Sequence, residues 1–246
     1  MKSIVNLSNV LLARLSGGQV IALGRALRGR GWPSHAIERL AIPAYSLFVA
    51  RDDVSGEVID RGLERAPDLA FLREPDMSER QRSRLAISLR GDRQVEMGLL
   101  RSLVDSARAS GLEPVFVTQV GRDDEKHRTL AAELNVEVCG WDGTNHRVQI
   151  ERVEDVYRTC RFVVSDRLHA LILGMVKGAQ PIALAHDGSD KLRSTLEGVI
   201  QLTTIEVACA LPVDLPPRSI DTLSGDVHRA RQRLDVLADR VGAMLA

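Results

Sequence analysis

A short polar patch at residues 165–169 carries the residue types best suited to chemistry. In the stretch RFVVSDRLHALILGMVKGAQPIAL (residues 161–184), it separates two apolar segments and contains Ser165, Asp166, Arg167 and His169. The first apolar segment is expected to be a strand and the second a helix. The patch should therefore lie where a helix N-terminus exposes unpaired backbone N–H groups and favours an anion.

Each side chain of the patch suggests a role. Arg167 provides a fixed charge that can hold phosphate or carboxylate through two hydrogen bonds. His169 should fall in the first helical turn, where the dipole favours the neutral imidazole used in proton transfer. Ser165 or Asp166 is expected to cap the helix. The alternative is structural, with a histidine packed in the core and an Asp166–Arg167 ion pair.

Two other strand ends carry candidate ligands for an anion. The strand at residues 181–185 leads into HDGSDK, where Asp187 and Lys191 could form a second wall of the same site. The alternative there is a plain turn followed by a helix cap. Arg51 follows an apolar run in the first part of the chain, and its alternative is an ordinary surface arginine.

The remaining polar clusters are weaker candidates for a functional site. Arg90 and Gly91 could line an interdomain cleft, and the loop at residues 140–146 could touch a ligand or only turn the chain. His127 and the charges around it are interpreted as a solvated helix face. No zincin, P-loop or dinucleotide-binding motif occurs, and no metal site is predicted.

From residue 84 onward, short β-rich runs alternate with amphipathic segments. This alternation is typical of a parallel sheet with crossover helices, and five or six strands with helices on both faces are expected. The expected strands cover residues 85–91, 113–119, 136–140, 161–165, 181–185 and 204–208. The expected helices cover residues 94–111, 123–134, 152–160, the run after 166, 190–199 and 226–244.

The first eighty or so residues are less regular. Strands are expected within residues 17–27, 45–53 and 67–72, and a helix within 53–63, which makes a partial α/β layer. The charged segment 73–84 is the best candidate for an interdomain linker. The predicted organisation is a partial N-terminal α/β domain at 1–76, a Rossmann-like domain at 77–225 and a C-terminal helix at 226–246.

The composition is that of an ordinary globular protein. The 246 residues include 33 Lys or Arg and 33 Asp or Glu, with 3% aromatic residues, so nucleic acid is a poor candidate partner. The three cysteines are widely spaced, which indicates neither a disulfide framework nor a zinc site. With no long apolar run and only a faint similarity to a signal peptide at the start, a cytoplasmic location is expected.

The segment VVSDRLHALILGMVKGAQPIAL followed by DGSDK resembles the signature of the polysaccharide pyruvyl transferase family. In that family a strand, an S/T-x-R-L-H motif, a buried helix, a G-x-P strand and a loop carrying lysine follow in this order. Residues 46–71 look like the family's R-D-x-x-S segment and the P-D strand after it. The chain has GAQP where G-x-P is commoner, so Lys191 matches the pattern less well than His169.

The resemblance implies an α/β fold of two Rossmann-like domains resembling GT-B glycosyltransferases. It implies transfer of the pyruvyl group of phosphoenolpyruvate to sugar hydroxyls, giving a ketal on a cell-surface polysaccharide or its precursor. His169 would be the general acid or base. Arg51, Ser165, Arg167, Asp187 and Lys191 would bind substrate. No cofactor is implied besides the donor.

Family members usually begin with a glycine-rich GxGNxGD-like stretch, which the opening MKSIVNLSNVLLARLSGGQV does not match. An incomplete N-terminal domain is therefore expected, from a truncated member or a start assigned too late. Two other functions stay open, a non-catalytic binding or scaffold protein and a GT-B-like glycosyltransferase that uses a nucleotide sugar. The expected partners are phosphoenolpyruvate and a saccharide or lipid-linked acceptor, with membrane-bound biosynthetic enzymes and a second copy of the chain left open.

Overall fold

The structure is a computed structural model that describes residues 2–27, 32–52, 54–58, 62–78, 80–143, 145–186, 191–196, 198–200, 202–207, 215 and 220–246. It contains two compact units. The first joins Met1–Leu72 to Arg229–Ala246, and the second is Arg73–His228. The sequence analysis placed its boundary after residue 76 and treated 226–246 as a separate helix. The end of the chain instead belongs with its beginning.

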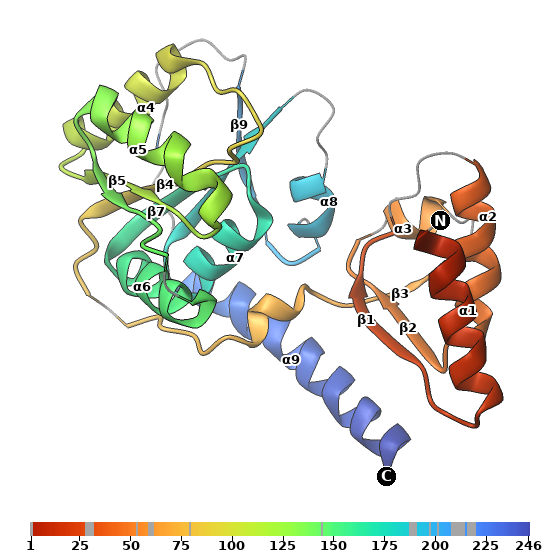
Figure 1. The fold of residues 1–246 in the computed structure, drawn as a ribbon. Helices are drawn as coiled ribbons and strands as arrows, with labels where there is room; N and C mark the ends of the chain where they lie inside the picture. The colour runs from red at the N-terminus through yellow and green to blue at the C-terminus, as the bar shows by residue number, and fades with distance from the viewer. Residues whose placement is uncertain are drawn as a thin grey trace. The chain divides into compact units, whose positions relative to one another are not determined.

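The second unit is built on a six-stranded sheet in which all neighbouring strands are parallel (Figure 1). Its strands, in spatial order, are β6 (Glu137–Cys139), β5 (Glu113–Val117), β4 (Arg84–Ser88), β7 (Cys160–Ser165), β8 (Gln180–Ala185) and β9 (Thr203–Glu206). Counted along the chain this order is 3-2-1-4-5-6, that of a doubly wound Rossmann sheet. The strands predicted from residue 84 onward are confirmed.

Helices cover both faces of this sheet. They are α4 (Met97–Ala109), α5 (Asp124–Leu134), α6 (His146–Thr159), α7 (Leu168–Val176) and the short α8 (Lys191–Leu196). The core cluster that contains Leu103 of α4 also contains Phe162 and Val164 of β7. Gly174 of α7 lies instead against Val163, which points to the opposite face because side chains alternate along a strand. Helices α4 and α7 therefore pack on opposite faces.

Helix α7 is buried on all sides from Ala170 to Val176, as its apolar sequence predicts. A Cβ at Gly174 would lie 2.4 Å from Cγ1 of Val163, so the glycine lets this helix sit directly on β7. The close seating fixes the start of α7 relative to the end of β7, where the polar patch lies.

The first unit has a three-stranded parallel sheet of β1 (Ile21–Arg25), β2 (Leu47–Ala50) and β3 (Glu64–Arg65). Its helices are α1 (Lys2–Leu15), α2 (Trp32–Ala41), α3 (Val54–Val58) and the part of α9 (Ile220–Leu245) that starts at Arg229, with a 3₁₀ turn at Ile42–Ala44. Its core includes Leu27, Ile42, Phe48 and Ala50, and Tyr45 packs edge-on against Phe48.

Two features of the first unit differ from the predictions. The expected strand at 67–72 is wrong, because Leu69–Leu72 forms a 3₁₀ helix. Asp68 turns the chain there by accepting a hydrogen bond from the N–H of Ala70 (3.0 Å), which competes with an extended backbone. Helices α1 and α2, which pack against each other, were not predicted.

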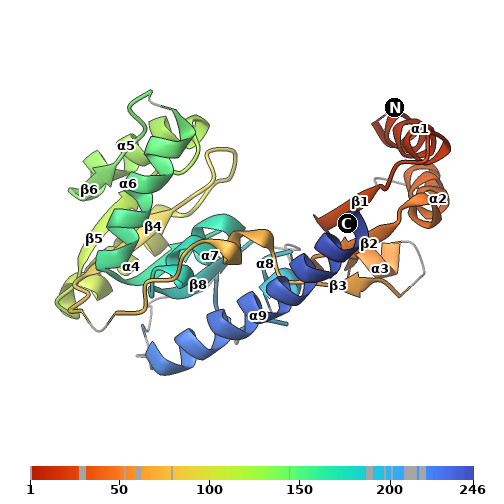
Figure 2. The ribbon, with the colours of Figure 1, turned by 90° about the horizontal axis from the view of Figure 1, so that it is seen from below.

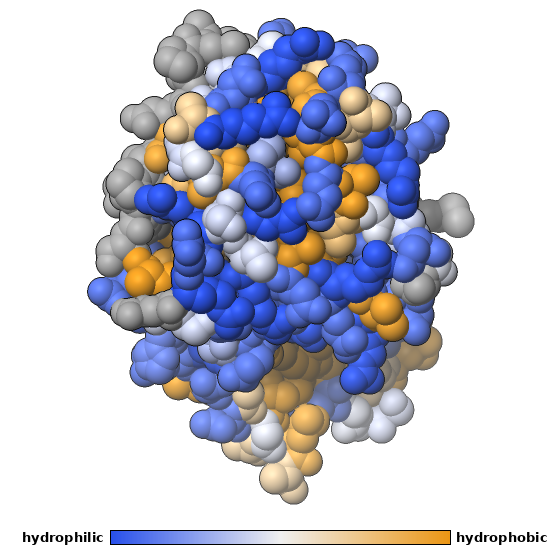
Figure 3. Space-filling model, turned by 90° about the vertical axis from the view of Figure 1, so that its left-hand side faces the viewer, coloured by the Kyte–Doolittle hydropathy of each residue, from blue (hydrophilic) through white to orange (hydrophobic). Residues whose placement is uncertain are grey.

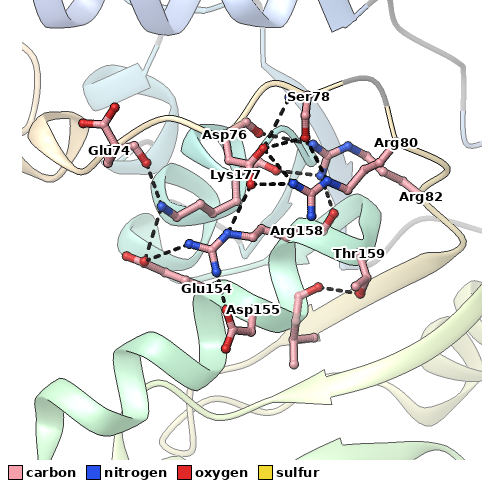
Figure 4. A network of polar contacts seen from close by, with 11 residues as sticks. Glu74, Asp76, Ser78, Arg80, Arg82, Glu154, Asp155, Arg158, Thr159 and Lys177 are labelled. Atoms are coloured by element: carbon pink, nitrogen blue, oxygen red, sulfur yellow. Dashed lines mark hydrogen bonds and ion pairs between the residues drawn. The ribbon is translucent and has the colours of Figure 1, made fainter.

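The charged segment after Leu72 is not a loose linker. Its Arg82 donates hydrogen bonds to the carbonyl oxygens of Arg158 (2.8 Å) and Lys177 (2.6 Å), and the Asp76 N–H donates to the carbonyl of Val176 (2.8 Å). Figure 4 shows Arg82 and Asp76 within one polar network that also includes Arg158 and Lys177. Lys177 and Glu154, both nearly buried, form an ion pair within it (3.3 Å). The segment is therefore anchored on the second unit.

Among the described residues, no helix is long and apolar enough to cross a membrane. On the face shown in Figure 3, hydrophilic side chains predominate and hydrophobic ones are interspersed among them. This distribution agrees with the balanced charge of the sequence.

Candidate functional site

The polar patch lies at the topological switch point of the larger sheet. From β4 the chain crosses to β5 on one side, and from β7 it crosses to β8 on the other side. The crevice beyond the carboxyl ends of two such strands is where open α/β sheets bind ligands. Oδ1 of Asp166, directly after β7, accepts a hydrogen bond from the N–H of Arg90, which follows β4 (2.8 Å).

Ser165 ties these two strand ends together. Its buried hydroxyl donates to the carbonyl oxygen of Ser88 and accepts from the N–H of Arg167 (2.9 Å). The predicted cap by Ser165 or Asp166 is wrong. The residue before α7 is Arg167, and no side chain caps the helix. The helix starts one residue later than expected because both side chains hold the strand ends instead.

Arg167 is held by a buried carboxylate from another strand end. Its side chain is 13% exposed, and its Nη2 forms a close ion pair with Oδ2 of Asp123, which is 1% exposed. Oδ1 of Asp123 accepts a hydrogen bond from the N–H of Gly91 (2.8 Å). The arginine is therefore fixed between the ends of β4, β5 and β7.

Asp166 is the second buried carboxylate of the cluster. Its side chain is 0% exposed, and Oδ2 lies 3.8 Å from Nη1 of Arg93 and 3.4 Å from Nε2 of His186, the residue after β8. The alternative prediction of a structural Asp166–Arg167 ion pair is wrong, because Arg167 pairs with Asp123 instead. We call Asp123, Asp166, Arg167, Arg93 and His186 the switch-point cluster.

Two neighbours support the loop that follows β4. Nζ of Lys126 donates to the carbonyl oxygens of Arg90 (2.9 Å) and Arg93, and burial lowers the pKa of Lys126. The guanidinium of Arg90 is bound by Asp92, and this hydrogen bond lowers the pKa of the Asp92 carboxyl. The loop is thus held in one conformation beside the cluster.

The interpretation of His127 as part of a solvated face is wrong. Its side chain is completely buried, with Nε2 accepting from the N–H of Leu89 (2.9 Å) and Nδ1 lying 2.8 Å from Oγ1 of Thr118. Burial lowers its pKa to about 4, so the ring is neutral near pH 7. It joins the end of β4 to the end of β5 as a structural residue.

The predicted site residues fall into three groups. Ser165, Arg167 and His169 lie together at the junction of β7 and α7, with His169 exposed in the first turn of the helix. Arg51 follows β2 in the first unit, where its Nη1 pairs with Oδ2 of Asp68 (2.9 Å). Asp187 lies outside the described residues, and Lys191 is described only as the first residue of α8.

Sequence reasoning missed Asp123, Arg93 and Lys126. A signal for Asp123 was present, because it comes shortly after the buried strand β5. Polar residues after parallel strands meet at one edge of the sheet, which is the rule that identified the patch after β7. Arg93 carries the same signal, because it comes shortly after the buried strand β4. Lys126 carries none, since its role depends on where a helix face comes to lie.

With this geometry in place, comparison with known proteins identifies the family. The family model described as polysaccharide pyruvyl transferase matches residues 2–188. The chain belongs to this family. A comparison of the sequence with curated proteins gives no match.

Two solved structures resemble the whole fold. A chain of the GtfA/B complex is 10% identical, with a TM-score of 0.56, and the match covers 93% of this chain and 52% of that chain. A putative UDP-N-acetylglucosamine 2-epimerase from Listeria monocytogenes is 11% identical, with a TM-score of 0.53, and the match covers 93% of this chain and 63% of that chain. The chain thus spans about half of the first chain's length and just under two thirds of the second's.

At such low identity the likeness shows the fold alone. The predicted fold class, α/β with two Rossmann-like domains resembling GT-B, is confirmed. The first unit is the smaller of the two among the described residues, with three strands against six.

Proposed function

We propose that this member of the pyruvyl transferase family moves the pyruvyl group of phosphoenolpyruvate onto two hydroxyls of a sugar, as a ketal, in cell-surface polysaccharide biosynthesis. The observation that carries the proposal is the junction of β7 and α7. There, Arg167 is fixed by a buried carboxylate, and His169 follows in the first helical turn. A cation for the donor and a group for proton transfer thus lie two residues apart.

The reaction needs a proton donor beside cations. A general acid protonates the methylene carbon of phosphoenolpyruvate, and the π electrons of the enol form the new C–H bond. The central carbon becomes cationic, a sugar hydroxyl adds to it, and the hydroxyl proton passes to a base. The C–O bond to phosphate then breaks, phosphate leaves with the electron pair, and the second hydroxyl closes the ketal and releases its proton. General acid–base catalysis and electrostatic stabilisation serve these steps.

In this scheme His169 is the general acid and then the base. Arg167 holds the carboxylate or phosphate of the donor, and we assign Arg51, Lys191 and Asp187 to substrate binding on the family pattern. Ser165 shapes the junction through its two backbone contacts. No cofactor enters the scheme. A cytoplasmic location, a saccharide or lipid-linked acceptor, and contact with membrane-bound enzymes complete the proposal.

The first test measures donor binding and turnover. Phosphoenolpyruvate is titrated by calorimetry, and phosphate release is then followed with a panel of methyl glycosides that carry neighbouring hydroxyls. His169→Gln should keep donor affinity within about threefold and lower turnover about 100-fold or more, the range expected for general acid–base catalysis. His228→Gln, an exposed histidine of α9, is the control and should behave like the wild type. Wild-type turnover by His169→Gln would remove His169 from the mechanism.

The second test separates this function from its alternatives. A glycosyltransferase that uses a nucleotide sugar would also place a diphosphate at a helix N-terminus beyond the sheet. Melting temperatures are therefore measured with phosphoenolpyruvate and with uridine diphosphate, each at a saturating concentration. Stabilisation by phosphoenolpyruvate alone supports pyruvyl transfer. Stabilisation by the nucleotide alone that is lost in Arg167→Gln contradicts it, whereas nucleotide stabilisation that Arg167→Gln keeps arises away from this junction. Donor binding without turnover on any acceptor favours the non-catalytic alternative.

A further inference from the structure

The first unit contains a cavity of about 430 Å³ between β3 and α9. Its lining includes Glu64 and Arg65 of β3 and Arg229, Arg233, Leu237 and Arg240 of α9. All of them belong to the first unit, so the cavity is formed within one compact body. Its volume lies in the range of sites for small molecules.

The lining of this cavity is strongly basic although the whole chain is neutral. Four arginines and one glutamate are among its lining residues, which together carry a net formal charge of +3. The only carboxylate, Glu64, is bound by Nη1 of Arg240 through both of its oxygens (2.8 and 2.7 Å). A second arginine, Arg233, is positioned by a hydrogen bond from Nη2 to the carbonyl oxygen of Arg65 (3.4 Å).

The helical repeat explains why these groups converge. Arg229, Arg233 and Arg240 follow one another at intervals of four and seven residues, so they share one face of α9. Two apolar residues of the same face, Val236 and Leu237, lie between them. Leu237 is 5% exposed, whereas Val236 is 70% exposed. The lining therefore combines arginine side chains with apolar contacts at Val236 and Leu237.

We propose that this cavity binds a small molecule that carries a phosphate or diphosphate group. Arginine is the side chain best matched to phosphate oxygens, because its planar fork donates two parallel hydrogen bonds. Val236 and Leu237 provide apolar contact for the carbon skeleton of such a ligand. The proposal stands on the first unit alone and does not depend on pyruvyl transfer.

The test uses the full chain and inorganic diphosphate as the probe, titrated by calorimetry at about 50 mM salt, where surface charges are weakly screened. Arg229→Gln/Arg233→Gln removes two charges from the cavity and should weaken the binding event at least about tenfold. The matched control is Arg101→Gln/Arg147→Gln, which removes two charges from exposed helix positions of the second unit (60% and 89% exposed). The control should bind within about twofold of the wild type.

A further variant distinguishes this cavity from the switch-point cluster. Arg167→Gln should leave the affinity of the cavity for diphosphate unchanged, because Arg167 is not among the lining residues. The proposal is overturned if Arg167→Gln abolishes all diphosphate binding, if the cavity variant binds like its control, or if the wild type does not bind.

A second experiment decides whether the bound phosphate belongs to a lipid headgroup or to a soluble molecule. Sedimentation with phosphatidylcholine vesicles, with and without phosphatidylglycerol, tests a lipid headgroup. Binding to the anionic vesicles that is lost in Arg229→Gln/Arg233→Gln assigns the site to a lipid-borne phosphate. Diphosphate binding without vesicle binding assigns it to a soluble ligand.

Discussion

At the scale of single residues, the candidate site depends on a buried carboxylate that holds Arg167 in place. Asp123 binds the guanidinium of Arg167 through one oxygen and the N–H of Gly91 through the other. Because it is 1% exposed, its charge is compensated by Arg167 rather than by water. We therefore regard Asp123 as a positioning residue.

Replacing Asp123 should weaken donor binding more than it slows the bound reaction. Asp123→Asn keeps an oxygen for the Gly91 N–H but removes the charge that orients Arg167. The Kd for phosphoenolpyruvate, measured by calorimetry, should rise about tenfold, equivalent to about 1.4 kcal/mol. Glu133→Gln, which releases the exposed Arg101, is the control. Equal or tighter donor binding by Asp123→Asn would show that Arg167 needs no such support.

His127 should make the protein sensitive to acid. Its pKa is about 4 in the folded protein and 6.5 when unperturbed. Above pH 6.5 the ring is neutral in both states. As the pH falls toward 4, the unfolded chain binds a proton that the folded one does not, so the free energy of unfolding falls by up to about 3 kcal/mol.

The measurement compares urea unfolding of the wild type and His127→Gln between pH 7 and pH 4. Carboxylates titrate in both proteins, so the difference between the two curves isolates the histidine. The stability advantage of the wild type should shrink as the pH falls. A difference that stays constant with pH would contradict the assignment.

The sequence predicted one part of the site well and the rest poorly. Ser165, Arg167 and His169 are neighbours in the chain, and their position between a strand and a buried helix is a local pattern. Asp123 meets Arg167 only because β5 and β7 flank β4 in the sheet. His127 looked exposed because charged residues surround it, but one face of α5 packs inward and includes it.

At the scale of elements, helix α7 is the part that positions the site. It has no exposed residue after its first turn, and it touches β7 through Gly174. Its location was predictable because it is apolar on every face. The locations of helices α1 and α2 were not predicted. Helix α1 carries polar residues within its apolar run, and the start signal of α2, Pro33 in its first turn, was not recognised.

Gly174→Ala should destabilise the second unit. The added Cβ would lie 2.4 Å from Val163 Cγ1, so α7 or β7 must move, at a cost of about 2 kcal/mol. Chemical denaturation measures the change. Gly98→Ala in α4 is the matched control, because nothing lies within 4 Å of a Cβ there.

A second substitution tests the cause. Val163→Ala removes the clashing methyl groups, so Gly174→Ala should cost less in that background than in the wild type. A cost that does not change would point to a different origin of the destabilisation.

At the scale of the whole molecule, the C-terminal segment of the chain belongs to the same unit as its N-terminal segment. Residues from Arg229 onward belong to the first unit, and Arg231 donates to the carbonyl oxygen of Leu72 (3.1 Å). No sequence pattern predicts which sheet a terminal helix joins, since its apolar face fits any core. The division of the chain into units therefore needed the structure.

A substitution near the C-terminus should therefore loosen the N-terminal sheet. Leu234 is 2% exposed on α9, and Leu234→Ala should cost about 3 kcal/mol. Hydrogen exchange should quicken in β1, β2 and β3 but not in β4 or β7. Val236→Ala, at a residue that is 70% exposed, should leave exchange nearly unchanged. Faster exchange in β4 instead would contradict the assignment of this segment.

The pairing of the two central strands of the larger sheet also affects how the second unit can fold while the chain is being synthesised. β4 and β7 lie side by side, although Ser88 and Ser165 are 77 residues apart in the chain. On a ribosome, β4, β5 and β6 emerge first, and one edge of β4 stays without a partner until β7 follows. That open edge is a template for pairing with another chain. Slower translation between β6 and β7 should therefore lower the yield of native protein.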